Sequence, residues 1–305
     1  MEIFKELIKR EWNNELTTDR LEILAKDVIE KYDYSQDLTS FIKDHIRVAM
    51  GLNPSQKNYF DDEIGYMKKN RVESPIMTKI DGVCKYCEEL TDQPECFDSC
   101  KYEAQIYKKG SGPVIKDDRC LSCGYCSNSC SFGALVDKIE FLPLIKLLKD
   151  NNTPVFACVA PSISGQFGDD ISMGQLRTGF KQMGFEDMIE VALFADILTI
   201  KEAYEFDKLV TSVDDFYLTS CCCPVWIKMV EKKYPELFDH MSLSVSPMIA
   251  SGRFMKELYP GAKAVFISPC TAKKAEAKEP NLKDAIDFVI TYQELKEIFT
   301  AIEID

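Results

Sequence analysis

Hydrophobic residues recur at helical spacing through residues 1–80. Two sets of apolar positions, three or four residues apart, predict two amphipathic helices: Leu21, Leu24, Ala25, Val28, Ile29 and Tyr32, then Leu38, Phe41, Ile42 and Val48. The run Gly51-Leu52-Asn53-Pro54 predicts the end of the second helix. This segment is highly charged and shows no pattern of catalytic residues, so we expect a small helical bundle that packs on a neighbour.

From residue 138 onward, helical patterns alternate with short apolar runs. A connecting helix is predicted within 138–153. Buried strands are predicted at 155–159, 188–193, 216–219, 264–267 and 288–290. Helices are predicted at 174–183, 195–206, 225–233, 250–258 and 292–301. Strand and helix in turn predict a mostly parallel sheet that is covered by helices on both faces.

Three loops follow predicted strands, at 160–162, 221–224 and 268–274. Because the carboxyl ends of parallel strands converge on one crevice, we expect Cys223 and Cys270 to face a common metal. Lys273 would lie close enough to give charge-assisted hydrogen bonds to an anionic ligand. The alternative for Lys273 and Lys274 is the solvated start of a helix.

Three consecutive cysteines, Cys221, Cys222 and Cys223, stand in the second of these loops. Adjacent side chains on an extended segment point to opposite faces, so one metal ion does not easily bind all three. The pattern favours a division of roles, in which one thiol is a ligand and its neighbour does something else. The alternative is a set of buried free thiols that pack as small hydrophobic groups.

Composition narrows the class of protein. The chain has 305 residues, 13 cysteines, 2 histidines and a formal net charge of −13. This acidic balance argues against nucleic acid and anionic membranes as partners, and no apolar run approaches the roughly 20 residues that span a bilayer. Residues 1–6 lack a secretory signal pattern, so the predicted location is the cytoplasm, where thiols stay reduced. The cysteines are therefore expected to be metal ligands or catalysts.

Eight further cysteines form two runs, Cys84-x2-Cys87-x8-Cys96-x3-Cys100 and Cys120-x2-Cys123-x2-Cys126-x3-Cys130. The second run has bacterial ferredoxin spacing, in which three thiolates bind one 4Fe-4S cluster and the fourth binds the other. One predicted ligand set is therefore Cys84, Cys87, Cys96 and Cys130. The other predicted set is Cys120, Cys123, Cys126 and Cys100. Gly124 and Gly133 would let the backbone approach the sulfides.

This stretch resembles a two-cluster ferredoxin domain, with two departures. Lys101 and Ser131 stand where a proline usually follows each fourth cysteine, and the first run has an insertion between Cys87 and Cys96. The alternative is a pair of zinc ribbons with four thiolates each. Ribbons usually pair two CxxC knuckles, whereas four cysteines within 120–130 suit a cubane better.

Residues 80–305 resemble an iron-only (FeFe) hydrogenase of a divergent clade. The resemblance is carried by 159–162, 195–206, 220–226, 245–248 and 269–276, which include the Cys-Pro-Val-Trp and Pro-Cys-Thr-Ala-Lys-Lys motifs. It implies an α+β and α/β multidomain protein: a helical segment at 1–80, a two-cluster ferredoxin-like domain at 81–137, and an incomplete α/β hydrogenase-type catalytic domain at 138–305. The implied enzyme interconverts dihydrogen with protons and electrons, and its ferredoxin-type clusters relay the electrons.

The catalytic centre of this family is a 4Fe-4S cluster joined through one cysteine to a diiron unit with CO, cyanide and a dithiolate bridge. The resemblance implies that Cys223 and Cys270 ligate this cubane and that Cys222 passes protons to and from the bridge. The residues implied to continue the proton path are Glu202, Ser242 and Glu205. Those implied to hold cyanide are Lys273 and Ser162, and those implied to line the cavity are Pro161 and Ser246.

The residues themselves support parts of this assignment. Glu202 and Glu205 stand at i and i+3 of a predicted helix, within relay distance on one face, although an ordinary solvated face is the alternative. A thiol beside a metal-bound thiolate, as expected for Cys222, is a credible acid–base group near neutral pH.

The catalytic region departs from the family in three places. The extra Cys221, whose role is open, shifts the usual threonine-serine pair to Thr219-Ser220, and Ser268 stands where methionine is frequent. The last motif of the family, which supplies two more cysteines, is absent after Cys270. We therefore expect either a fragment that is inactive alone or a relative that has lost the diiron site.

The expected partners are a ferredoxin or another redox protein, dihydrogen and protons, and maturation proteins, without nucleic acid or membrane insertion. The alternative function is a non-catalytic iron–sulfur protein for electron transfer or cluster assembly. A third is a redox or hydrogen sensor, in which the helical N-terminal segment is the output or docking element. The family's sensory members tend to lack the thiol found here at Cys222, which favours catalysis.

Overall fold

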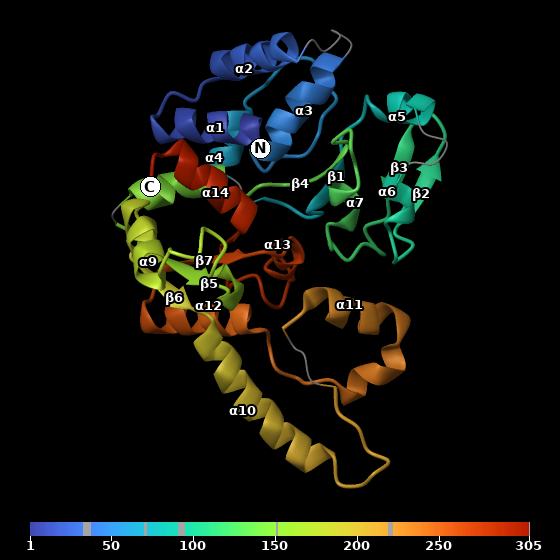
Figure 1. Ribbon diagram of the computed structural model, residues 1–305, viewed down its shortest axis with the longest axis vertical. Coiled ribbons are helices and arrows are strands. Elements are labelled where there is room, and N and C mark those ends of the chain that lie inside the picture. The colour runs from blue at the N-terminus through green and yellow to red at the C-terminus, as the bar shows by residue number, and fades with distance from the viewer. Residues whose placement is uncertain (33–37, 70–71, 91–94, 151, 219–221, 305) are drawn as a thin grey trace. The chain divides into compact units, whose positions relative to one another are not determined.

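The computed structural model describes residues 1–304 apart from 33–37, 70–71, 91–94, 151 and 219–221 (Figure 1). Backbone packing divides the chain into two compact units: unit 1 is Met1–Lys149 with Gln293–Asp305, and unit 2 is Asp150–Tyr292. The helical segment and the cysteine-rich region thus share unit 1. The backbone units do not follow the boundaries predicted from the sequence. The division into domains at 1–80, 81–137 and 138–305 therefore stays a prediction.

Helices form one part of unit 1. They are α1 (Glu2–Trp12), α2 (Thr18–Lys31), α3 (Thr39–Ala49), α4 (Glu63–Lys69), α8 (Phe141–Lys149) and α14 (Tyr292–Ala301), whose first residue belongs to unit 2. α1 buries Phe4, Leu7 and Ile8 along one face and packs on α2, α3 and α8. Thr17 starts α2 by accepting a hydrogen bond from the backbone N–H of Arg20. The two amphipathic helices predicted from the sequence correspond to α2 and α3.

Among the described residues, four short strands and three short helices form the cysteine-rich part of unit 1. β1 (Met77–Lys79) pairs antiparallel with β4 (Leu135–Asp137), and β2 (Gln105–Lys108) pairs antiparallel with β3 (Gly112–Ile115). The helices are α5 (Cys84–Leu90), α6 (Glu95–Asp98) and α7 (Tyr125–Asn128). Strands this short carry too little periodicity to be predicted from sequence. Their pairing brings the two cysteine runs together.

Unit 2 is built on a parallel sheet with the strand order β6-β5-β7-β8. The strands are β5 (Val155–Val159), β6 (Asp187–Glu190), β7 (Lys263–Ser268) and β8 (Phe288–Thr291). Every residue of β5 is buried, as expected for a strand covered on both faces. α12 (Pro247–Leu258) packs on β5 and β7, while α9 (Met173–Gln182) packs on β6. The predicted parallel α/β sheet is therefore confirmed.

Two predicted strands differ from the structure. The run at 188–193 is too long, because Val191 already has helical geometry and α10 (Ala192–Leu209) follows β6 directly. The run at 216–219 is wrong as a strand: Leu218 makes one isolated bridge to Met241, and residue 219 lies outside the described residues. The Leu218 N–H donates to the His240 carbonyl at 2.7 Å instead of joining the sheet. The cysteine loop therefore does not follow a sheet strand.

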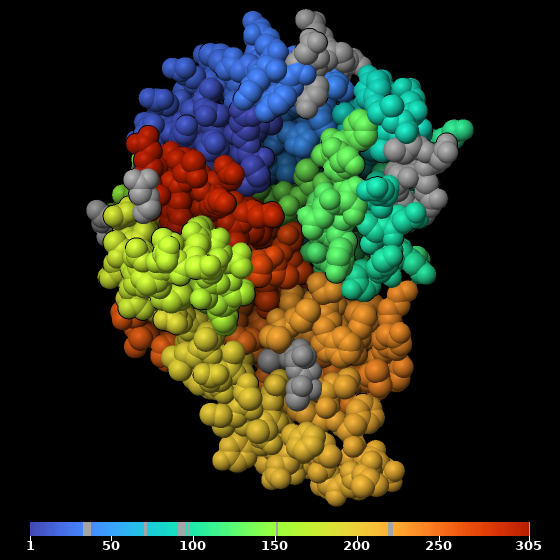
Figure 2. Space-filling model, viewed as in Figure 1, coloured from blue at the N-terminus to red at the C-terminus, as the bar shows by residue number. Residues whose placement is uncertain are grey.

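Unit 2 also contains η2 (Pro161–Ile163), α11 (Pro224–Lys233), η3 (Pro235–His240) and α13 (Ala272–Glu276). α10, yellow in Figures 1 and 2, runs away from the sheet and exposes large apolar side chains: Leu193, Ile197, Ile200 and Tyr204. These four positions are spaced by three or four residues, so they share one face of the helix. Among the described residues, no helix combines the length and the hydrophobicity needed to cross a membrane.

Candidate iron–sulfur and catalytic site

Four thiols of unit 1 line one cavity of about 80 Å³. They are Cys84 and Cys87 in α5, Cys96 in α6, and Cys130 after α7. β1 leads towards Cys84 and β4 follows Cys130, so the pairing of these strands brings the two cysteine runs to one place. The structure thus gathers the four cysteines that their spacing assigns to one cluster.

Gly112 forms part of the wall of this cavity. Its φ is +71°, and a Cβ built on it would lie 2.5 Å from the Sγ of Cys84. Only glycine lets the β2–β3 hairpin come so close to the sulfur.

Burial, followed by the charges of Cys130, Cys84 and Cys87, raises the pKa of Cys96 to about 11. A bound cation would therefore be needed to keep Cys96 as a thiolate at neutral pH.

The second set of thiols lies around Cys126. Burial, followed by the charges of Cys120, Cys123 and Cys100, raises the pKa of Cys126 to about 12. Its electrostatic neighbours are thus the three cysteines predicted to share its cluster. Two backbone amides donate to these sulfurs: Ala104 to Cys100 at 3.3 Å and Ser122 to Cys120 at 3.4 Å. Hydrogen bonds of this kind tune the reduction potential of an iron–sulfur cluster.

The arrangement of the thiols fits a multi-iron cluster. A zinc ribbon brings four sulfurs to about 2.3 Å from one ion. Within the described ranges, no three His, Cys, Asp or Glu side chains gather closely enough to hold a single metal ion. The first set of thiols instead surrounds a space. The donor set and its spacing thus suit the cofactor predicted from the sequence.

In unit 2, two of the three predicted loops meet at one edge of the sheet. β5 and β7 are parallel neighbours, and beyond them the Ala160 N–H donates to the Ile267 carbonyl at 2.9 Å. Ser162, exposed in η2 next to the exposed Pro161, has its hydroxyl 2.9 Å from that of Tyr292. Tyr292 also donates to the Ala160 carbonyl at 3.2 Å. Tyr292 was not predicted as a site residue from the sequence, although it begins the helix predicted at 292–301.

Cys270 and Lys273 follow β7 at the same edge. Cys270 is half-buried, and its N–H donates to the Ser268 hydroxyl at 3.3 Å. Lys273 and Lys274 are 8% and 0% exposed, so the solvated-helix alternative is wrong. The physical reason is that α13 packs on β8 and α11. Lys273 Nζ lies 2.6 Å from Glu276 Oε2, as a buried ammonium requires a counter-charge.

Cys222 and Cys223 are exposed immediately before α11. The Cys223 carbonyl accepts a hydrogen bond from the Ile227 N–H at 3.1 Å, and Pro224 takes the first helical position, where its missing N–H costs nothing. α11 packs on α13, so the helices that follow Cys223 and Cys270 contact each other. Cys221 lies outside the described residues.

Glu205 on α10 is the centre of a hydrogen-bonded group. The Ser242 hydroxyl lies 3.3 Å from its carboxylate, Lys201 Nζ lies 3.1 Å away, and the Tyr217 hydroxyl donates to it. The bond from Tyr217, assisted by Lys201 and Ser242 and opposed by burial, holds the pKa of Glu205 below its ordinary value. The i, i+4 spacing of Lys201 and Glu205 is readable in the sequence. No sequence pattern marks Tyr217.

Two buried polar atoms of unit 2 have no hydrogen-bond partner among the described residues, Oε1 of Glu202 and Nε1 of Trp226. Buried polar atoms nearly always have a hydrogen-bond partner in folded proteins, so both positions suit a water molecule or a bound group. Ser246, by contrast, caps α12: its buried hydroxyl accepts the Ile249 N–H at 3.4 Å. The cavity-lining roles of Ser246 and Pro161 stay predictions.

Fold and site together define a class of protein. Ferredoxin-like thiol sets lie in one unit, and further thiols adjoin a parallel α/β sheet in the other, as in an iron–sulfur oxidoreductase. A family model described as "Iron only hydrogenase large subunit, C-terminal domain" matches residues 153–305, half of the chain. The chain belongs to this family.

The chain is also similar to known hydrogenases and to a cluster assembly factor. The chain is 30% identical over 282 residues to the NADP-reducing hydrogenase subunit HndD of Solidesulfovibrio fructosivorans, covering 81% of this chain and 47% of that protein. It is 32% identical over 163 residues to iron hydrogenase 1 of Clostridium pasteurianum, covering 47% and 28%. It is also 28% identical over 213 residues to the cytosolic Fe-S cluster assembly factor NAR1 of Vanderwaltozyma polyspora, covering 67% and 40%. The chain thus spans about half the length of these proteins or less.

Proposed function

We propose that this chain is the electron-transferring and catalytic part of an FeFe hydrogenase, which interconverts dihydrogen with two protons and two electrons. Membership of the iron-only hydrogenase family and similarity to hydrogenase subunits support the proposal. The observation that carries it is the group around Glu205. A carboxylate held by Ser242, Tyr217 and Lys201 lies in the same unit as Cys222, Cys223 and Cys270, and such a group suits proton transfer.

The catalytic cubane and diiron unit, when bound, supply the metal centre at which dihydrogen is cleaved or formed. Cys223 and Cys270 would be the thiolates of this chain that hold the cubane. The exposed Cys222 would accept or donate protons beside it. Lys273 and Ser162 would hold cyanide ligands, Lys273 through an ammonium that Glu276 keeps buried and oriented. Pro161 and Ser246 would line the cavity.

Protons would pass between Cys222 and solvent through Glu202, Ser242 and Glu205. Glu202 Oε1, buried and unpartnered among the described residues, suits a water or a bound group within this path. Glu205, with its pKa held low, would stay ionised at neutral pH and accept a proton through Ser242. Tyr217 would keep the Glu205 carboxylate in position.

Electrons would reach the catalytic site through the two thiol sets of unit 1, each holding a 4Fe-4S cluster. The proposed external partner is a ferredoxin or another redox protein, because the relay ends in clusters of the same type. Maturation proteins would insert the diiron unit. The cytoplasmic location stays a part of this proposal.

A second candidate is a non-catalytic role in iron–sulfur cluster assembly. The similarity to the yeast assembly factor favours it. The same eight thiols of unit 1 would serve either role, so unit 1 does not discriminate between the two candidates.

The test is hydrogen evolution from a reduced dye by the complete natural protein that contains these residues, matured anaerobically with FeFe-hydrogenase maturation proteins. We expect steady evolution that requires maturation. An iron-loaded, matured protein that evolves no hydrogen, yet delivers clusters to an apo-acceptor, would reject the hydrogenase assignment in favour of the second candidate.

A further inference from the structure

Helix α3 touches both turns that flank the first set of thiols. Gly82, with φ +126°, lies two residues before Cys84, and a Cβ there would be 3.4 Å from Phe41 Cβ. Gly133, with φ +70°, lies three residues after Cys130, and a Cβ there would be 3.5 Å from the imidazole of His45. The Gly133 N–H donates to the Cys130 carbonyl at 3.0 Å. One helix therefore contacts the turn before Cys84 and the turn after Cys130.

Phe41 and His45 form one rigid pair on α3. Their rings pack edge to face, with centroids 4.6 Å apart at an angle of 80°. The imidazole of His45 hydrogen-bonds the Gly133 backbone, and burial lowers its pKa to about 4. His45 therefore stays neutral at physiological pH, and contributes a hydrogen bond and shape to the Gly133 turn, not a charge.

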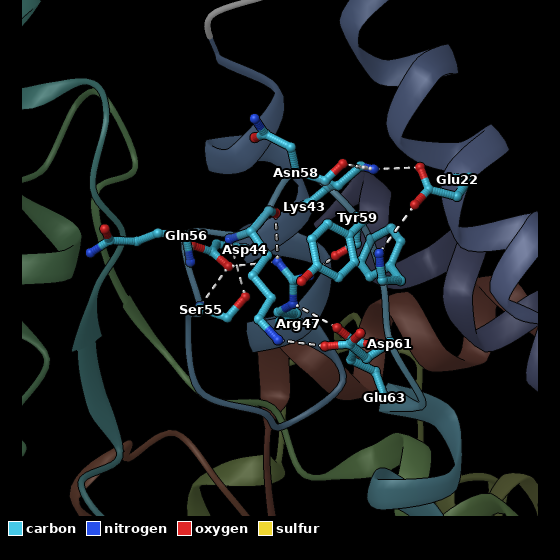
Figure 3. Close-up of polar contacts among 12 residues, drawn as sticks. Glu22, Lys43, Asp44, Arg47, Ser55, Gln56, Asn58, Tyr59, Asp61 and Glu63 are labelled. Carbon is cyan, nitrogen blue, oxygen red and sulfur yellow. Dashed lines mark hydrogen bonds and ion pairs between the residues drawn. The ribbon is translucent and has the colours of Figure 1, made fainter.

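A buried polar network fixes α3 itself (Figure 3). Arg47 is 1% exposed and donates to Asp44 at 2.8 Å and to Glu63 at 3.0 Å. Asp44 in turn accepts the backbone N–H groups of Ser55 and Gln56 at 2.8 and 2.9 Å. Oε2 of Glu63 is the one buried atom of these side chains without a hydrogen-bond partner among the described residues. Buried charges that are otherwise paired have few alternative arrangements, which holds α3 and the loop at 55–63 in one position.

The same network reaches the first thiol set by a second route. The side chain of Gln56 donates to Asp81 at 2.7 Å. Asp81 immediately precedes Gly82, and it also pairs with Lys79 at 2.6 Å. α3 is thus connected to the turn before Cys84 both by packing through Phe41 and by hydrogen bonds through Gln56.

We infer that α3 is a positioning element for the first thiol set, and that His45 and Phe41 fix the Cys130 and Cys84 turns and thereby set the reduction potential of the cluster they hold. The inference rests on the proposed function in one respect, namely that Cys84, Cys87, Cys96 and Cys130 ligate a 4Fe-4S cluster. Cluster potentials depend on hydrogen bonds to the sulfurs and on solvent exposure, both of which change when a ligand turn moves. Residues 1–80 then have a role in tuning the first electron carrier.

The test is a redox titration of the complete chain, followed by electron paramagnetic resonance, in which each cluster is assigned with variants that lack one ligand, Cys96→Ala or Cys123→Ala. His45→Leu keeps bulk but removes the hydrogen bond to the Gly133 turn. We expect it to shift the midpoint potential of the first cluster and leave that of the second unchanged. His45→Gln, which keeps a hydrogen-bonding group, should restore most of the wild-type potential. Gln56→Ala should shift the first potential in part.

Leu24→Ala is the matched control, because Leu24 is buried in the same bundle on α2. It should weaken the bundle and leave both potentials unchanged. Equal shifts in Leu24→Ala and His45→Leu, or no shift in either His45 variant, would overturn the inference. A wild-type chain that assembles no cluster on the first thiol set would instead reject the ligand assignment of the proposed function.

Discussion

At the scale of single residues, the carboxylate of Glu205 is the most densely contacted member of the proposed proton path. Tyr217, Ser242 and Lys201 each stabilise its ionised form, and Tyr217 contributes most. A carboxyl whose pKa is lowered by folding stabilises the native state above its ordinary pKa, and that stabilisation is lost as the pH falls through the lowered value.

Tyr217→Phe should raise the pKa of Glu205 towards its ordinary value, because the strongest hydrogen bond to the carboxylate is removed. The melting temperature of the variant should therefore lie below that of the wild type at neutral pH, and the difference should shrink as the pH falls through the lowered pKa of Glu205. Thermal unfolding followed from pH 7 to pH 3 checks this. A difference that does not change with pH would mean that Tyr217 acts through packing alone.

Cys222 and Cys223 are adjacent, yet their predicted roles differ. In the complete matured enzyme, Cys222→Ala should leave the cofactor assembled and slow turnover by about 10²- to 10⁴-fold, the usual contribution of a positioned acid–base group. Cys223→Ala should instead lose the catalytic cubane, which infrared and resonance spectra would report. If the two variants behave in the opposite way, the assignment is displaced by one residue and Cys222 is the ligand.

At the scale of elements, the β2–β3 hairpin shapes the first thiol set through Gly112. Gly112→Ala places a methyl group on the Cys84 sulfur at a positive φ, so it should abolish the first cluster and reduce iron from about eight to about four per chain. Gly110→Ala is a matched control: its φ is +80°, and a Cβ there meets nothing within 4 Å. Iron analysis of both variants after anaerobic reconstitution is the measurement. Equal iron in the two would contradict the proposed role of Gly112.

The elements of unit 2 were largely predictable because apolar runs such as 155–159 and 264–267 form buried parallel strands, whose sequence is continuous and hydrophobic. The run at 216–219 has a similar composition and failed, because Leu218 pairs with the loop near Met241 and not with the sheet. The strands β1–β4 were not predicted, since three or four residues give no readable period. The hydrophobic pattern of a segment thus predicts buried strands and helices. It misses short strands that form only by pairing with another segment.

At the scale of the whole molecule, the two thiol sets were predictable because the number of residues between cysteines limits which sulfurs can bind the same 4Fe-4S cluster. The cysteines whose charges raise the pKa of Cys96 and of Cys126 are those that the spacing assigns to the same cluster. Tyr292 and the link from α3 to the Gly82 and Gly133 turns were not predictable, because they join segments far apart in sequence or lie in a helix with no recognisable motif. The pairing of Glu276 with Lys273 has a readable i, i+3 spacing but was not predicted. The role proposed for residues 1–80 rests on the contacts of α3 with these two turns, and no sequence pattern indicated it.

The chain should bind about eight iron atoms in unit 1 and no stoichiometric zinc, because its eight thiols are arranged for two cubanes. Metal analysis after anaerobic reconstitution checks this. Cys158→Ala is the control, since Cys158 is a fully buried thiol of β5 that belongs to neither set, and its loss should leave the iron content unchanged. Stoichiometric zinc with little iron would reject the cluster assignment.

We propose that this family member cleaves dihydrogen at a site held by unit 2. The most direct measurement is the exchange of dihydrogen with D₂O to give HD, made on the complete natural protein after anaerobic maturation, since exchange needs neither an electron partner nor a dye. HD should form only after maturation, and its formation should be strongly reduced in Cys222→Ala. A matured protein with its full iron content that forms no HD would show that unit 2 does not cleave dihydrogen.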